Sequence, residues 1–123
     1  MKNLVQDCDR ITYVNTTGSA IASGAVVVAG SLLAVASVDI PVGGTGAAAT
    51  MGVFEVPKTA GQAFAQGEKL IYDVSASAFI NSSGTPAAGD IVGAATAWEA
   101  AASAATVARV CLCCIPGTIT AGG

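Results

Sequence analysis

Short apolar runs alternate along this chain with Gly, Ser, Thr and Pro at fairly regular intervals. Runs of this length, rich in Val, Ile and Leu and separated by turn residues, are typical of a β-sandwich or barrel. The pattern predicts strands at Arg10–Val14, Ala25–Ala29, Leu32–Val38, Met51–Val56, Lys69–Val74, Ile91–Ala97 and Thr106–Ile115.

A glycine turn leads into a strand at three places, through a similar local sequence each time. The three segments are Ser23-Gly24-Ala25-Val26-Val27, Gln66-Gly67-Glu68-Lys69-Leu70 and Ala88-Gly89-Asp90-Ile91-Val92. Glycine adopts the positive φ that a tight turn requires without a steric penalty. Repeated entries of this kind favour a β-meander or Greek-key arrangement.

The last predicted strand alternates in part, so that its side chains divide between two faces. One face carries Val107, Arg109, Cys111 and Cys113, and the other carries Val110, Leu112 and Cys114. Both sets are mostly apolar. We therefore expect this strand to be covered on both sides.

Helix is scarce. Ala60–Gln66 has the length of about two helical turns, with Thr59 as an N-cap and Gly67 as the stop, and Glu99–Ala105 is rich in alanine. Neither segment is long enough to be a stable helix without packing. The predicted fold is an all-β, compact β-sandwich or barrel-like domain with Gly-rich turns and at most one or two short helices. Its extended arms would flank the body: an N-terminal arm (1–9), a single β-rich domain (10–115) and a C-terminal tail (116–123).

Composition adds a reason to expect partners. Hydrophobic residues make up 53% of the chain but aromatic residues only 5%. Small side chains bury little area each, so a lone subunit should be only modestly stable, and oligomerisation would supply the missing burial. The formal net charge is −3, and no run of Lys or Arg offers the basic surface that nucleic-acid binding needs.

A membrane span is the main alternative in another functional class. No charged residue lies between Arg10 and Asp39, and Ala20–Val38 is apolar enough to resemble a transmembrane segment. Gly24 and Gly30, however, divide the stretch into pieces of strand length, and basic residues that would set an orientation are missing. We expect neither a span nor a signal peptide, and solubility without detergent would exclude this alternative.

The sequence offers little for catalysis, metal binding or cofactors. Histidine is absent, which excludes Ser-His-Asp triads, Cys-His dyads and His-ligated metals. Gly44–Ala49 matches the letters of a dinucleotide fingerprint, but no helix can follow it, so we expect a flexible loop. The cysteines, Cys8, Cys111, Cys113 and Cys114, lack zinc-site spacing. They are expected to be small buried hydrophobic residues, with a disulfide or intersubunit bridge from Cys8 as the alternative. A Cys-dependent enzyme ranks lowest because no base is present to activate a thiol. We predict no enzyme.

Several segments, taken in order, resemble one known family. They are Asn3–Gln6, Ser23–Val27, Leu33–Ala36 with Asp39-Ile40, the Gly43–Gly46 loop, Gly52–Lys58 (GVFEVPK), Gly67–Asp73, Gly89–Ala95 and Val110–Leu112. The chain is similar over roughly residues 3–112 to the small capsid decoration (cement) proteins of tailed bacteriophages. Two departures are a Tyr72-Asp73 junction where the family commonly has Trp-Asp after its Tyr, and an extension over Cys113–Gly123.

The resemblance implies a virion structural protein, made in the host cytoplasm, that binds the outer surface of the phage head as a homotrimer. There it would bridge major capsid proteins and stabilise the shell; a head-fibre or head-fibre-base protein is a close variant. The N-terminal residues Lys2, Asn3, Leu4, Val5 and Gln6 are the candidate capsid contacts. Val53, Phe54, Val56 and Trp98 are the candidate contacts between subunits.

Overall fold

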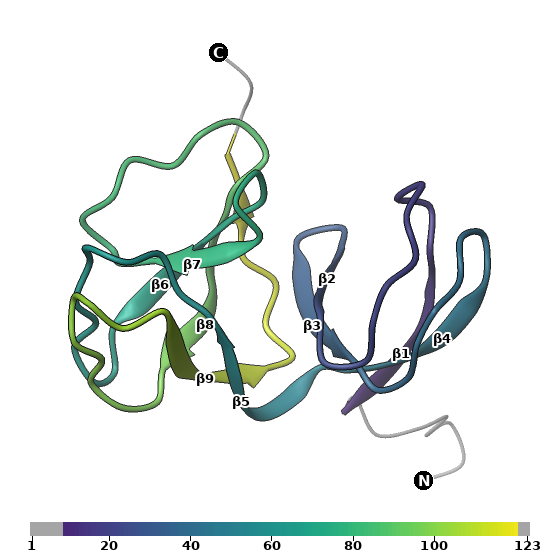
Figure 1. Ribbon diagram of the computed structural model, residues 1–123, viewed down its shortest axis with the longest axis horizontal. Helices are drawn as coiled ribbons and strands as arrows, with labels where there is room; N and C mark the ends of the chain where they lie inside the picture. Colours follow the sequence, from purple (N-terminus) through teal and green to yellow (C-terminus); the bar gives the residue numbers. More distant parts are fainter. Residues whose placement is uncertain (1–8, 121–123) are drawn as a thin grey trace, which may run out of the picture.

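The computed structural model describes residues 9–120, which fold into two antiparallel β-sheets without a helix (Figure 1). Its strands are β1 (Arg10–Val14), β2 (Val26–Ala29), β3 (Leu32–Ala36), β4 (Thr45–Ala49), β5 (Met51–Pro57), β6 (Lys69–Asp73), β7 (Ala78–Ile80), β8 (Ile91–Ala97), β9 (Val107–Cys113) and β10 (Thr118–Ile119). The all-β prediction is confirmed.

The two sheets correspond to the two halves of the chain. The first sheet has the strand order β1-β4-β3-β2, and the second has the order β5-β9-β8-β6-β7, with β10 added to β8. Strand β5 follows β4 with only Thr50 between them, so one stretch of backbone passes directly from the first sheet into the second (Figure 1). Thr50 is fully buried.

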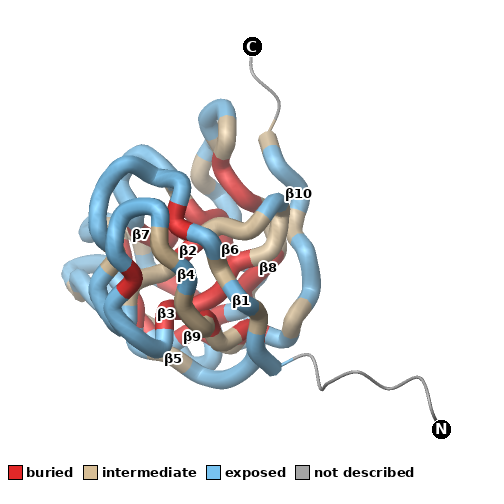
Figure 2. Tube along the Cα trace, turned by 90° about the vertical axis from the view of Figure 1, so that its right-hand side faces the viewer, coloured by how far each residue is buried: buried red, intermediate tan, exposed pale blue. Residues whose placement is uncertain are grey.

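Strand β3 lies between two hydrophobic clusters. Leu33 and Val35 belong to the larger cluster, which fills the space against the second sheet, whereas Ala34 and Ala36 belong to a smaller cluster inside the first sheet. Alternating side chains of a strand point to opposite faces, so β3 is covered on both sides. The buried segments gather in the middle of the molecule in Figure 2.

The larger cluster holds most of the bulky side chains. Tyr72 and Phe79 face each other across the β6–β7 pair, with ring centroids 5.0 Å apart. The smaller cluster consists of two alanines of β3 with Val27, Ile40 and Ala48. The small size of most of its side chains explains why this sheet depends on its neighbour for burial.

Four copies of one hydrogen-bonded turn introduce β2, β4, β6 and β8. In each copy a glycine with φ between 74° and 90° lies two residues before the strand: Gly24, Gly43, Gly67 and Gly89. The residue after each glycine donates its N–H to the carbonyl of the residue two before the glycine, at 2.9–3.1 Å. The glycine itself donates to the residue that closes the turn, and that residue donates back to the one after the glycine. The closing residues are Ala36, Asn15, Ala97 and Thr120, respectively.

Three of these turns were predicted from the sequence, and their positive φ is confirmed. The fourth, at Gly43, was not, because Thr45 rather than a large apolar residue follows it. Asn15 closes this fourth turn and is 1% exposed. Its side-chain amide donates to the carbonyls of Ser19 (2.8 Å) and Ile40 (3.1 Å), so a buried polar group is satisfied within the turn.

Residues 44–49 do not form the expected flexible loop. Thr45–Ala49 is β4, paired with β1 on one side and β3 on the other. Gly46 serves close packing, because a Cβ there would lie 2.7 Å from the Ile40 Cγ1 atom. The small side chains of this strand let its neighbours approach, which local sequence preference does not reveal.

Neither of the two segments considered for short helices is helical; both consist of turns and irregular backbone. Phe64 and Ala101, one from each segment, form an isolated antiparallel bridge, with N–H to O distances of 2.9 and 3.0 Å in the two directions. Each segment thus satisfies backbone groups of the other. Pairing across the fold outweighs the helical preference of alanine.

The uncharged stretch Ala20–Val38 contains a single bridge at Ile21 and the β2–β3 hairpin. Within residues 9–120, no helix is long and apolar enough to cross a membrane. Near the other end of the chain, Thr118 and Ile119 pair with Val92 and Ile91 of β8, so this part of the tail lies against the second sheet. The division into arm, domain and tail remains a prediction.

Candidate protein-docking face

The outer side of the β5–β9 ladder carries exposed apolar side chains that the core does not explain. Antiparallel pairing places Met51 opposite Cys113, Val53 opposite Cys111, Glu55 opposite Arg109 and Pro57 opposite Val107. Strand β8 pairs with the other edge of β9 and extends this surface. Thr96 lies opposite Cys111, and the Trp98 N–H donates to the Arg109 carbonyl. These ten residues are the docking face: Met51, Val53, Glu55, Pro57, Thr96, Trp98, Val107, Arg109, Cys111 and Cys113.

The inner side of the same ladder belongs to the core. Val56, Ala108, Val110 and Leu112 are at most 5% exposed, whereas Val53 is 43% and Val107 is 49% exposed. The predicted division of this strand into two faces is therefore confirmed. The expectation that both faces are covered is wrong for the isolated subunit, because no element within residues 9–120 packs over the outer one.

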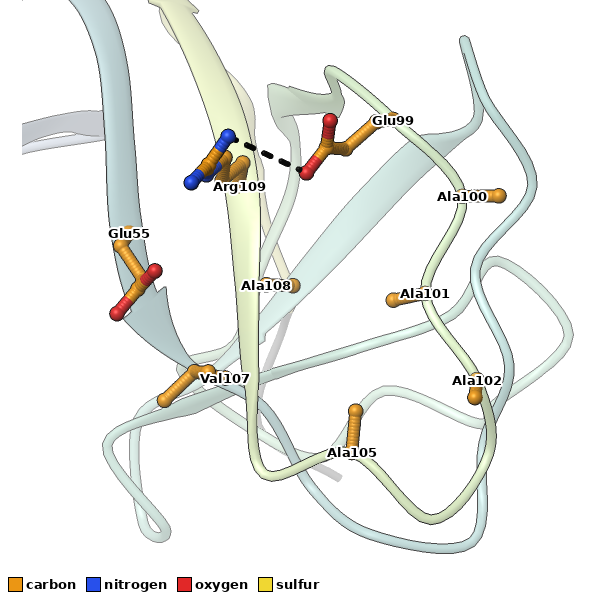
Figure 3. Close-up of a pocket in the computed structure, with 9 residues that line it drawn as sticks. All are labelled: Glu55, Glu99, Ala100, Ala101, Ala102, Ala105, Val107, Ala108 and Arg109. Carbon is orange, nitrogen blue, oxygen red and sulfur yellow. Dashed lines mark ion pairs between the residues drawn. The ribbon is translucent and has the colours of Figure 1, made fainter.

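Three charged groups lie at one side of this face. The Arg109 Nη1 atom is 3.7 Å from the Glu99 Oε1 atom, and both side chains are more than half exposed. Figure 3 shows Arg109 directed toward Glu99, with Glu55 on the neighbouring strand. An exposed pair of this kind adds little to stability. It gives the face instead a polar group that a partner can recognise.

A shallow cavity of ≈ 340 Å³ opens beside this ion pair. The residues lining it are Glu55, Glu99, Ala100, Ala101, Ala102, Ala105, Val107, Ala108 and Arg109 (Figure 3). Most of the wall is the alanine-rich loop between β8 and β9. Since alanine side chains are short, the loop offers a surface that an opposing protein can approach closely.

A buried lysine holds that loop in place. Lys58 is 3% exposed, and its Nζ atom donates hydrogen bonds to the carbonyls of Thr59 (3.1 Å), Ser103 (3.3 Å) and Ala105 (3.1 Å). The same ammonium lies 5.2 Å from the centroid of the Phe64 ring. Two of these three carbonyls, those of Ser103 and Ala105, belong to the loop, and the hydrogen bonds compensate the buried charge of Lys58.

Two thiols lie together at the other end of the docking face. The Sγ atoms of Cys111 and Cys113 are 3.4 Å apart, and one thiol donates to the other. Cys111 is half-buried and Cys113 is exposed. Burial raises the pKa of the Cys111 thiol, and its interaction with Cys113 raises it further. The expectation of fully buried cysteines is wrong here, because these two alternate outward on β9; Cys8 lies outside the described residues.

The sequence-predicted site residues fall into three groups. Val53 and Trp98 are on the docking face, with Trp98 54% exposed. Phe54 is half-buried against the larger core cluster, and Val56 is 2% exposed within it, which leaves Val56 no surface for a second subunit. The candidate capsid contacts, Lys2 to Gln6, lie outside the described residues.

Sequence reasoning grouped Val107 and Arg109 on one face of the last strand, but it named neither of them, nor Met51, as a candidate contact. The signal was the alternation along Met51–Pro57 and along Val107–Cys113, and it can be interpreted only when the two strands are known to be paired. Among residues 9–120, no group of three or more His, Cys, Asp or Glu side chains is placed to hold a metal ion. The arrangement as a whole suits protein binding: apolar rows on a rigid ladder, a tryptophan and an ion pair.

A second cleft of ≈ 420 Å³ lies where the first sheet meets the second. Both edge strands of the first sheet, β1 and β2, contribute to its wall, and Tyr72 and Val74 contribute from the second sheet. The first sheet is therefore curled enough for its two edges to share one cleft.

Comparison with known proteins gives one match. Residues 5–112 match a family model described as phage cement protein. No curated protein and no solved structure matches the chain.

Proposed function

The chain belongs to the phage cement protein family, and from this premise we propose that it is a capsid decoration subunit that binds the outer surface of a phage head. It contacts major capsid proteins, bridges neighbouring copies and so strengthens the shell. The family match over residues 5–112 is the observation that carries this proposal.

The docking face supports assembly of the subunit into a homotrimer. Val53, Val107 and Trp98 are each more than two-fifths exposed, on a ladder whose other side carries the buried side chains of Val56, Val110 and Leu112. Large apolar side chains gathered on one face mark interaction sites. The first sheet has only a small core of its own, so covering this face on a second copy supplies burial that the single chain lacks.

The N-terminal segment is the proposed link to the capsid. Asp9, the residue that precedes β1, accepts a hydrogen bond from the Thr50 N–H (2.9 Å), and the Thr50 carbonyl accepts one from the Cys114 N–H (2.9 Å). Asp9, the first residue that the structure describes, therefore lies beside the Met51–Cys113 end of the docking face. We propose that residues 1–8 pair as an added strand with an exposed strand edge of the capsid protein, and three copies per trimer add avidity.

The mass of the protein in solution, measured with and without empty capsids, tests both trimer formation and capsid binding. Analytical ultracentrifugation of the wild-type chain should give a trimer, and the trimer should co-sediment with expanded empty shells of its own phage. Deleting residues 1–6 should abolish co-sedimentation and leave the trimer intact. Retained capsid binding by the truncated protein refutes the role of the segment.

The Val53→Glu substitution tests the face. It places a charge among apolar neighbours and should convert the trimer into monomers, since a buried unpaired charge costs several kcal/mol. Val14→Glu is the matched control, because Val14 is also an exposed strand valine (51%) but lies on the first sheet. If Val53→Glu remains trimeric, or if Val14→Glu dissociates equally, the docking face is not the subunit interface.

A further inference from the structure

We infer that Cys111 and Cys113 form a chelating dithiol site for a thiophilic cation that takes two thiolates from the protein, with trivalent arsenic as the representative ligand. The two residues are separated by one position on β9 and project from the same face. Their sulfur atoms are already 3.4 Å apart. Cys113 is exposed and Cys111 half-buried, so a small ligand can reach both.

The sulfur–sulfur separation selects among soft cations by geometry. With cation–sulfur bonds of about 2.3 Å, a separation of 3.4 Å corresponds to a sulfur–cation–sulfur angle of roughly 95°. Pyramidal trivalent arsenic binds its ligands near a right angle. A linear two-coordinate cation would need the sulfur atoms about 4.6 Å apart at the same bond length, so the pair does not suit that class.

The number of protein ligands also favours trivalent arsenic. No third His, Cys, Asp or Glu joins the pair among the described residues. Structural zinc takes four protein ligands, and this pair supplies two. An arsenical that carries one organic group needs only two thiolates, and it is therefore the class that the site satisfies fully.

Chelation also demands less movement than a disulfide between the same two residues. A disulfide needs the sulfur atoms about 2.05 Å apart, with Cα atoms at most about 6.8 Å apart, a limit that two positions along a strand just reach. The end of β9 is held in place, because Cys113 is paired with Met51 and the Cys114 N–H donates to the Thr50 carbonyl. Closing a disulfide would pull against these contacts, whereas a chelate accepts the distance already present.

Phenylarsine oxide is the probe for this site. Each thiol gives up its proton, two arsenic–sulfur bonds form, and the oxygen of the arsenical leaves as water; no atom changes oxidation state. Binding is measured by native mass spectrometry and by titration of the remaining thiols, in the full chain carrying Cys8→Ser. In this background the chain should take up one arsenical, which a monothiol such as glutathione fails to remove and 1,2-ethanedithiol removes.

Single substitutions separate the pair from the third nearby thiol. Cys111→Ser or Cys113→Ser should weaken binding about 100-fold or more, since one anchoring bond is lost from a chelate. Cys114→Ser should bind as the parent does. Equal binding after Cys113→Ser overturns the inference.

Assembly of the subunits could shield both thiols from the arsenical. The titration is therefore repeated with the Val53→Glu chain, which is expected to be monomeric. Uptake by that chain supports the site, whether or not the unsubstituted protein binds. Failure of both chains to take up the arsenical overturns it. This result is independent of the capsid measurements.

Discussion

Replacing the buried lysine by methionine should remove a large share of the stability of this protein. Lys58→Met keeps an unbranched stem of similar length beside Phe64 but deletes the ammonium group. Three carbonyl oxygens, those of Thr59, Ser103 and Ala105, then lose the donor that lies 3.1–3.3 Å from them. The perturbation is therefore confined to hydrogen bonds and charge, with little change in volume.

The magnitude follows from those contacts. A buried acceptor left without a partner costs about 1–3 kcal/mol, and the lower end applies because the loop can relax toward water. The Ser103 carbonyl keeps a second hydrogen bond, from the Gly61 N–H (2.6 Å), so only the Thr59 and Ala105 carbonyls are counted. Two acceptors at about 1 kcal/mol each, with about 0.5–1 kcal/mol for the contact between the ammonium and the Phe64 ring, give a gross loss near 3 kcal/mol. Relief of the desolvated charge offsets part of it. We expect the free energy of unfolding to fall by about 2 kcal/mol, against a typical total of about 5–15 kcal/mol.

Urea denaturation followed by circular dichroism measures the loss as a lower midpoint at an unchanged slope. Lys69→Met is the matched control: Lys69 is exposed on β6, and its replacement should change the free energy of unfolding by less than about 0.5 kcal/mol. Equal effects of the two substitutions would refute the assignment of Lys58 as the group that fixes the β8–β9 loop.

Two further predictions concern the tail and the acid side of the stability profile. Gly117→Ala should detach β10, because a Cβ there would lie 2.6 Å from the Val92 carbonyl oxygen; hydrogen exchange at the Thr120 amide should accelerate, and unchanged exchange would contradict this. Hydrogen bonds from the Ala65 N–H and from Ser82 lower the pKa of Glu68 below 4.5. The stabilisation from its carboxylate is present above the unfolded-state pKa and is lost as pH falls through the folded-state pKa. Glu68→Gln should therefore flatten the fall in melting temperature on acidification, and an identical pH profile would exclude this role.

The strands that the sequence predicted are those with β-branched or large apolar residues. Arg10–Val14 and Ile91–Ala97 were predicted with the bounds that the structure has. Strand β4 was missed because Gly, Ala and a single Thr carry no strand preference, and its conformation comes from pairing on both sides. The helix-forming tendency of Glu99–Ala105 is outweighed for a similar reason, since Lys58 and Phe64 bind its backbone.

The site was predicted less completely than the fold. Val53 and Trp98 were identified because an apolar residue in a strand and an isolated tryptophan are informative on their own. The Arg109–Glu99 pair and the Cys111–Cys113 contact depend on which strand pairs with which. Pairing across the second sheet is set by contacts between residues distant in the chain, and local preference carries no information about it.

The single residue between β4 and β5 has a mechanical consequence. Thr50 joins the two sheets covalently, and its N–H and carbonyl are hydrogen-bonded to Asp9 and Cys114, so the residue before β1, the β4–β5 junction and the residue after β9 meet at one point. Tension applied along β5 reaches the first sheet through this backbone as well as through the side chains that pack between the two sheets. The seven paired positions of β5 and β9 then resist it in shear, all at once. A subunit loaded along that direction yields only when the whole β5–β9 ladder slips.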